Sequence, residues 1–194
     1  MTEPDLTPET PADDADPLAD RSNIVEGLTG RLPLLVGGLM LFLSCGLMFG
    51  LRNLFHRNSN TITFDDVSTW GPLFLAAILI VAPLLHTAAH AVALAAMGLP
   101  QRWSRAGVYP RVRPAAPVSR RQAVRFFAAP FILAALLAAL VVIKPVSVFA
   151  AVVGGVNLAI AAADAWKILG LQRFPAKTTF EVHADHCRAL NAGR

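Results

Sequence analysis

Two histidines four residues apart, His86 and His90, lie in the apolar stretch "PLLHTAAHAVALAAMG" of residues 83–98. On an α-helix, residues at this spacing share one face about 6 Å apart, so both imidazoles can bind a single metal ion. A zinc site needs a third protein ligand. The candidate is Asp164, the acidic residue that falls inside one of the predicted membrane spans.

The elements that must position these residues are long and apolar. The chain has 194 residues, 55% of them hydrophobic, and a mean hydropathy of +0.52. Runs of about 18 or more apolar residues are long enough to cross a bilayer as helices. Four such runs occur, at residues 33–51, 71–98, 126–143 and 146–166. The sequence therefore predicts an all-α integral membrane protein, with four transmembrane helices in a lipid bilayer.

The basic residues predict an orientation. All 17 Lys and Arg except Arg52, Arg57 and Lys144 fall in or beside the N-terminal segment, the 99–125 loop and the C-terminal segment. Because loops rich in Lys and Arg stay cytoplasmic, we expect a multi-pass protein of the cell membrane with both termini in the cytoplasm. The net charge of +4 then reflects topology. No basic motif with interleaved aromatic residues accompanies it, so nucleic acid is not an expected partner.

The chain divides into three regions. Residues 1–30 carry eight carboxylates and one arginine, which predicts a disordered acidic tail. Residues 31–175 form the predicted four-helix membrane domain, and residues 176–194 the predicted cytoplasmic C-terminal tail. Alternation and prolines in the 99–125 loop predict a short basic hairpin between the second and third helices. Ser119 is expected to cap the third helix.

The predicted depth of these residues in the membrane supports one site shared by the second and fourth spans. The midpoint of the two histidines lies about 17 residues into its span, and Asp164 about 18 residues into the fourth. Both spans run in the same direction, so both positions lie roughly 26 Å from the outer surface. Asn157 precedes Asp164 by about two helical turns on the same face. It could orient a ligand or bind a substrate backbone.

These residues resemble those of the site-2-protease class of intramembrane zinc metallopeptidases, and are closest to its small zincin-peptidase branch in bacteria and archaea. In that class, a His-Glu-x-x-His motif lies within one membrane helix and a later helix supplies an aspartate as the third zinc ligand. "HTAAH", His86 to His90, occupies the motif, and "NLAIAAAD", Asn157 to Asp164, resembles the later segment. The basic hairpin and a following helix with an early proline, Pro130, also resemble the branch. The resemblance covers roughly residues 70–185.

The chain departs from the family pattern at Thr87. The family has glutamate there, which takes a proton from zinc-bound water and passes it to the leaving amine. Threonine does not titrate near neutral pH, and no Asp or Glu lies nearby in the sequence. Zinc alone can lower the pKa of bound water to about 7, but general acid–base catalysis is worth ~10²–10⁴-fold. The family's glycine after the second histidine is Ala91 here.

Other roles for these residues remain open. The two histidines could bond to backbone carbonyls as packing residues, and Asp164 could pair with Lys167 three residues on. Two histidines on one helix do not suit the opposite faces of a haem. The C-terminal cluster "HADHC", His183–Cys187, has ligand types, but is expected to be a solvated segment.

Three functions follow. The leading prediction is a zinc protein of this peptidase type, with zinc at His86, His90 and Asp164 and with peptidase activity lost or impaired. It would bind a membrane-protein partner in the former substrate groove. The first alternative is an active protease whose base comes from elsewhere. The second is a transporter or scaffold, without metal, that uses the three residues as a proton relay. Two imidazoles and one carboxylate suit zinc.

Overall fold

The computed structural model of the protein describes residues 24–26, 32–56, 71–106, 108–183 and 186–190. Within these residues, four helices are long and apolar enough to cross a membrane, which indicates a multi-pass membrane protein. They are α2 (Leu32–Phe55), the helix Gly71–Ala96, α5 (Arg120–Leu140) and α6 (Ser147–Leu171), the last preceded by the 3-10 turn η2 (Lys144–Val146). The four predicted spans are thus confirmed as helices.

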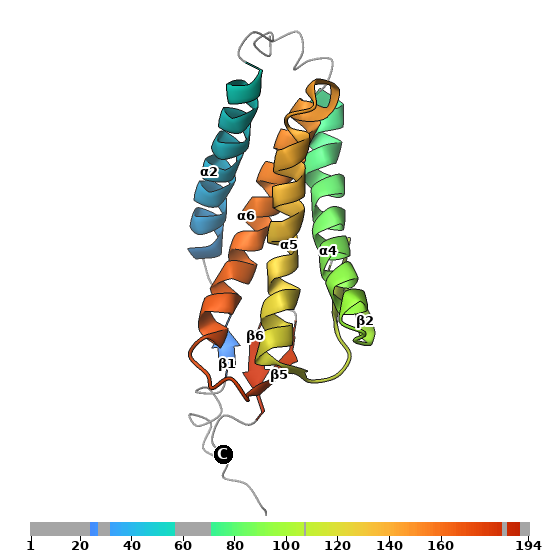
Figure 1. Ribbon diagram of the computed structural model, residues 1–194, viewed down its shortest axis with the longest axis vertical. Coiled ribbons are helices and arrows are strands. Elements are labelled where there is room, and N and C mark those ends of the chain that lie inside the picture. Colours follow the sequence, from blue (N-terminus) through green and yellow to red (C-terminus); the bar gives the residue numbers. More distant parts are fainter. Residues whose placement is uncertain (1–23, 27–31, 57–70, 107, 184–185, 191–194) are drawn as a thin grey trace, which may run out of the picture.

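Helix α6 is the centre of the bundle. It packs against α2 on one side and against α5 and α4 on the other (Figure 1). Small residues let α2 come close, because Gly155 on α6 lies against the backbone of Cys45. The hydroxyl of Ser44 donates a hydrogen bond to the Gly155 carbonyl at 2.7 Å. A polar bond between two apolar helices fixes their rotation as well as their distance.

Replacing Gly155 by alanine is expected to destabilise the protein by about 1–3 kcal/mol, because the added carbon overpacks the α2–α6 contact. An alanine Cβ there would lie 2.8 Å from the sulfur and 3.0 Å from the Cα of Cys45. The matched control is Gly50→Ala on α2, whose Cβ would meet no atom within 4 Å. Denaturation of the full chain in detergent measures the free energy of unfolding of both variants. Equal stability of the two variants would contradict the predicted contact.

The second helix changes its winding midway. Residues Ala77–Val81 form a π-helical turn, η1, before α4 (Ala82–Ala96). Pro83 accounts for the irregularity, because it has no N–H to donate to the carbonyl of Leu79 four residues earlier. The hydroxyl of Tyr109 donates to that carbonyl instead, at 2.8 Å.

The predicted basic hairpin is present as strands β2 (Gln101–Ala106) and β3 (Tyr109–Pro114), paired antiparallel with Trp103 opposite Val112. Side-chain bonds attach it lengthwise to the second helix: Gln101 donates to the Ala91 carbonyl at 2.9 Å, and Tyr109 donates to Leu79. The acceptors are twelve residues apart, about 18 Å along the helix axis. The hairpin therefore runs beside the membrane span that carries the two histidines.

Helix α5 begins at Ser119, as predicted. The Ser119 hydroxyl accepts from the backbone N–H of Gln122, and the Gln122 side chain accepts from the backbone N–H of Ser119, so the two residues form a capping box. This fixes where α5 leaves the strands and therefore which of its residues face α4.

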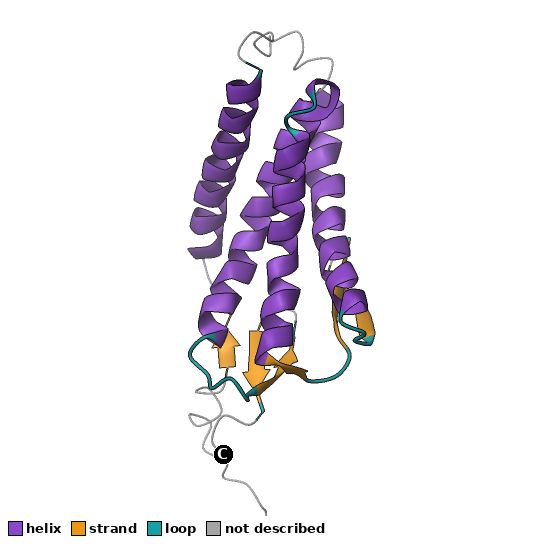
Figure 2. Ribbon diagram, in the orientation of Figure 1, coloured by secondary structure: helices purple, strands orange, loops and turns teal. Residues whose placement is uncertain are grey.

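The all-α prediction is incomplete, because strands cover one end of the bundle (Figure 2). A four-stranded antiparallel sheet has the order β1-β6-β5-β4. Its strands are β1 (Ile24–Glu26), β4 (Val118–Ser119), β5 (Thr179–Val182) and β6 (His186–Ala189). We call this end of the bundle the strand end.

The sheet incorporates segments that the sequence led us to expect as tails. In β5 and β6 every second side chain is buried, and Phe180, Val182, Cys187 and Ala189 join one core cluster with helix residues such as Phe127. Alternation over four residues is too short to predict a strand reliably beside long apolar runs. Of the 1–30 segment only Ile24–Glu26 is described, as β1; the rest of that predicted disordered tail lies outside the described residues.

Candidate metal centre

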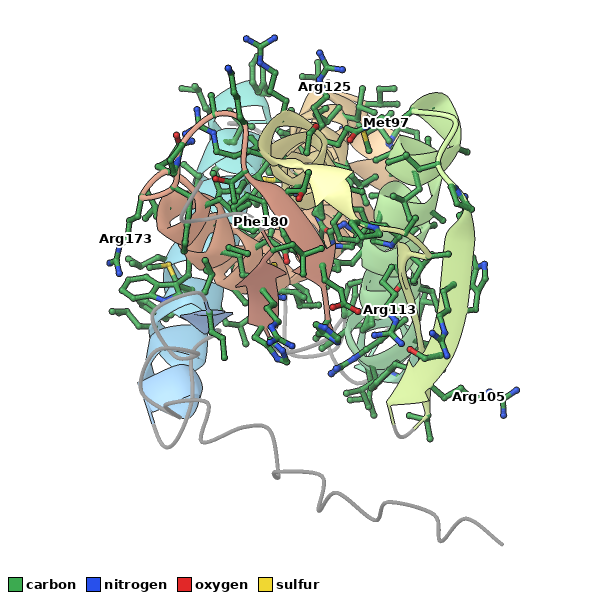
Figure 3. The ribbon with its side chains drawn as sticks, turned by 90° about the horizontal axis from the view of Figure 1, so that it is seen from below. Met97, Arg105, Arg113, Arg125, Arg173 and Phe180 are labelled. Carbon is green, nitrogen blue, oxygen red and sulfur yellow. The ribbon has the colours of Figure 1, made fainter. Side chains whose placement is uncertain are left out.

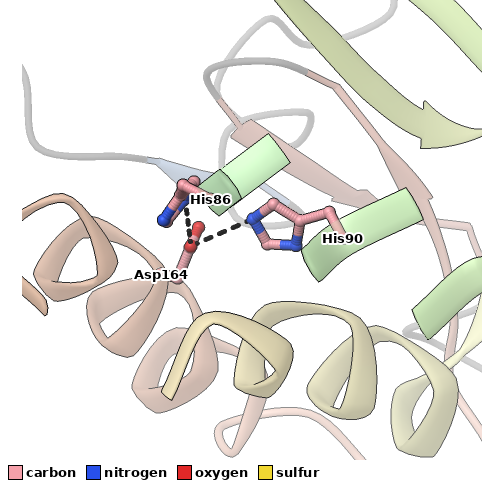
Figure 4. Close-up of side chains that lie close together, drawn as sticks. All are labelled: His86, His90 and Asp164. Carbon is pink, nitrogen blue, oxygen red and sulfur yellow. Dashed lines mark ion pairs between the residues drawn. The ribbon is translucent and has the colours of Figure 1, made fainter. Parts of the chain in front are cut away.

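The structure brings His86, His90 and Asp164 together (Figure 4). Oδ2 of Asp164, on α6, lies 3.2 Å from Nε2 of His86 and 3.2 Å from Nε2 of His90, both on α4. The two imidazole rings meet edge to face, with centroids 4.9 Å apart. His90 and Asp164 are buried, and the His86 side chain is 12% exposed. Within the described parts of the chain, this is the one group of three or more His, Cys, Asp or Glu close enough to share an ion.

The tautomer of His90 follows from its second ring nitrogen. Nδ1 lies 2.9 Å from the carbonyl oxygen of Phe126 on α5. A carbonyl only accepts, so Nδ1 carries a proton, and in the neutral imidazole Nε2 is then the nitrogen with the lone pair. The carbonyl has no N–H four residues on because position 130 is proline. The ring is also stacked on Phe126, with centroids 4.4 Å apart.

The tautomer of His86 is fixed through Asn157. The amide nitrogen of Asn157 donates to the carbonyl of Pro130 at 2.8 Å, which leaves its oxygen to face Nδ1 of His86 at 3.2 Å. That oxygen only accepts, so Nδ1 of His86 also carries the proton. Asn157 is fully buried and thus orients His86, as the sequence suggested it could.

With both imidazoles neutral, Nε2 of His86, Nε2 of His90 and Oδ2 of Asp164 are three acceptors that converge on one another. Oδ2 of Asp164 is buried and has no hydrogen-bond partner among the described residues. Lone pairs that face each other in a buried site repel unless a cation lies between them. The 3.2 Å separations exceed the ~2.7–2.9 Å of a charge-assisted hydrogen bond. Ligand atoms ~2.0–2.1 Å from a tetrahedral zinc stand ~3.3 Å apart, so the residues present fit a metal ion.

Replacing Pro130 by alanine is expected to weaken metal binding by ~10–100-fold, the usual effect of losing a group that orients a ligand. The new N–H would compete with His90 for the Phe126 carbonyl. The helix itself should gain stability, since proline inside a helix costs about 3 kcal/mol relative to alanine. Competition with a chromophoric chelator gives the affinity, and thermal unfolding gives the stability. Unchanged affinity would contradict the assigned role of the proline.

Thr87 lies between the two histidines and binds the hairpin. Its hydroxyl donates to the carbonyl of Pro110 on β3 at 3.1 Å. Thr87 thus holds a strand against the helix. Sequence reasoning could not detect this bond, because nothing in the local pattern links residues 87 and 110.

A pocket of about 380 Å³ opens beside the three residues. Its walls are α4, α5, α6, the hairpin and the end of β5, and Thr87, Phe127 and Ile160 line it near the site. Arg111, Arg113, Lys167 and His183 also line it. None of these four was a predicted site residue, since the residues come from three distant segments and carry no shared spacing.

Lys167 is the residue that the sequence offers as an alternative partner of Asp164. Its ammonium lies over the Phe127 ring, 5.0 Å from its centroid, and the Asp164 carboxylate contacts the two imidazoles. In the C-terminal cluster, the rings of His183 and His186 stack with centroids 4.5 Å apart. Cys187 is fully buried, and burial raises the pKa of its thiol to about 12. It is therefore a protonated core residue at neutral pH, and the cluster is only partly solvated.

No protein-family model, no curated protein and no solved structure matches the chain in the comparisons made with each.

Proposed function

We propose that this chain is a membrane-embedded metal-binding protein of the intramembrane metallopeptidase type, in which His86, His90 and Asp164 hold one zinc ion and peptidase activity is lost or severely impaired. One observation carries the proposal: Nδ1 of each histidine faces an acceptor, so the two Nε2 atoms and one carboxylate oxygen converge in a buried site with the geometry of metal ligands. The resemblance of the sequence to site-2 proteases supplies the functional class.

The surrounding residues hold the ligands in place. Asn157 and the Phe126 carbonyl each fix one imidazole with its Nε2 toward Asp164. The stacked Phe126 and the core around it exclude water from one side. When bound, a zinc ion supplies Lewis-acid polarisation of an oxygen in the adjoining pocket.

The loss of activity is argued from position 87. A general base must lie within hydrogen-bond reach of the proton that it takes. Among the described residues, Asp164 is the one carboxylate that lines the pocket, and it faces the two imidazoles. Thr87 instead binds the hairpin. A protein that keeps the site and loses the base would act by binding a membrane partner in this pocket.

The orientation in the cell membrane is part of the proposal. The strand end of the bundle carries the arginines of the start of α5 and the arginine that follows α6 (Figure 3 labels Arg125 and Arg173), whereas Arg52 and Lys144 lie at the opposite helix ends. This asymmetry favours a cytoplasmic strand end and, with it, cytoplasmic termini.

Proteolysis assays separate the proposal from an active enzyme. Full-length protein supplied with zinc is incubated with membrane-embedded peptides in proteoliposomes, beside His90→Ala. We expect the same low background of peptide cleavage from the wild type and from His90→Ala. Cleavage by the wild type that disappears in His90→Ala would replace the proposal by the active protease. Folded protein that takes up no metal would favour the proton relay, in which a shared proton separates the three acceptors.

A further inference from the structure

Basic side chains gather on one wall of the pocket. Arg111, Arg113 and Lys167 line it, together with His183. Among the described residues, Asp164 is the carboxylate that lines it, and the two imidazoles contact it. Cations gathered in a concave, partly apolar site attract an anion more strongly than the same charges do on an open surface.

Arg113 supplies a second and independent observation. Its Nη1 lies 3.5 Å from Nδ1 of His183, at the limit of a hydrogen bond. Its Nε is buried and has no hydrogen-bond partner among the described residues. Figure 3 places Arg113 between the hairpin and the helices, whereas Arg105 points outward from the far end of the hairpin. A buried guanidinium N–H without an acceptor is costly, so an acceptor in the pocket would stabilise it.

The depth of the pocket matches the lipid headgroups. Lys167 is four residues before the end of α6 at Leu171, or about 6 Å along the axis. His86 is ten residues before the end of α4 at Ala96, or about 15 Å. In helices that cross a bilayer, Lys167 therefore lies near the level of lipid phosphates, and the His/His/Asp site lies deeper.

The size and lining of the pocket favour an amphipathic anion. A volume of about 380 Å³ accommodates more than an inorganic ion and falls in the range of pockets for small organic ligands. Phe127, Ile160 and Val182 offer apolar walls beside the cations. A guanidinium fork matches the geometry of phosphate oxygens.

We infer that this pocket binds the phosphate monoester group of an amphipathic molecule, with Arg113 and Lys167 on the phosphate and the apolar walls on the chain attached to it. The charges belong to the protein itself, so the inference goes beyond the proposed function and does not require a metal.

Native mass spectrometry of the full chain in mixed micelles tests the inference. The probe is phosphatidic acid, with phosphatidylcholine as the neutral reference. One phosphatidic acid per chain should be retained in preference to phosphatidylcholine. Arg113→Gln and Lys167→Gln should each weaken its binding roughly tenfold to a hundredfold, the loss expected for a hydrogen bond to a charged group. Arg105→Gln, which removes an exposed charge of the same hairpin, should leave it unchanged.

Two further arms identify the source of the ligand and separate the two proposals. If millimolar inorganic phosphate displaces the lipid, the result supports an oxyanion site in the pocket and shows that free phosphate also enters. If the lipid resists displacement, the result supports a site for the phosphate group of a lipid. Asp164→Asn should keep lipid binding even if it loses metal. Equal binding of both lipids, or an equal loss in Arg105→Gln and Arg113→Gln, would overturn the inference. Thermal unfolding confirms that each variant is folded. If Arg113→Gln does not fold, the lipid binding of Lys167→Gln still tests the inference.

Discussion

Thr87→Glu is expected to create hydrolysis of membrane-embedded peptides that is absent or barely detectable in the wild type. Position 87 lies between the two histidines on α4, and its side chain lines the same pocket as theirs. A glutamate there cannot donate to the Pro110 carbonyl as the threonine does, because two acceptors repel. Its carboxylate should therefore turn into the pocket, where it can take a proton from water. General acid–base assistance is worth ~10²–10⁴-fold.

Thr87→Gln is the matched control, since it has the same length and also disturbs the hairpin, but cannot act as a base. Cleavage is measured in proteoliposomes with zinc. The gain should appear in Thr87→Glu, be absent in Thr87→Gln, and disappear in Thr87→Glu combined with His90→Ala. Equal rates in the glutamate and glutamine variants would contradict the view that only the base is missing.

Asp164→Asn is expected to abolish tight metal binding and leave the fold intact. Asparagine keeps the shape of the side chain but removes the charge that offsets a cation between the two imidazoles. The loss of affinity should exceed the ~10–100-fold that removal of an orienting group costs. Zinc at about 100 times its dissociation constant should stabilise the wild type by about 2.7 kcal/mol, and should not stabilise the variant.

Glu181→Gln is the control for this variant. Glu181 also lies beside a histidine, with Oε2 3.5 Å from Nε2 of His183, but its side chain is 48% exposed. Its loss should leave metal affinity unchanged. Competition with a chelator measures the metal affinity of both variants, and thermal unfolding with and without zinc measures how much the metal stabilises each. A variant at position 164 that binds zinc as tightly as the wild type would place the ion elsewhere.

Much of the fold could be predicted from patterns of neighbouring residues in the sequence. Long apolar runs predict helices because the backbone must satisfy its own hydrogen bonds in lipid, and all four runs are helical. Ser119 predicts the start of α5, and alternation with prolines predicts the hairpin. Equal depth on two helices that run in the same direction placed the histidines opposite Asp164, and in the structure they lie 3.2 Å from it.

The remaining features depend on contacts between distant segments. The four-stranded sheet joins residues around 25, 118, 180 and 187, and each strand is too short to be recognised alone. Pro83 and Pro130 each leave a carbonyl that a side chain from another element uses, Tyr109 in one case and His90 in the other. The sequence identifies the proline, but only the packing identifies the donor.

Metal content tests the central claim most directly. Full-length protein purified in detergent is incubated with zinc, freed of unbound ions and analysed by elemental mass spectrometry together with a protein concentration and an unfolding curve. The account predicts one zinc ion per folded chain, bound at His86, His90 and Asp164. Folded wild-type protein that retains no metal would contradict it.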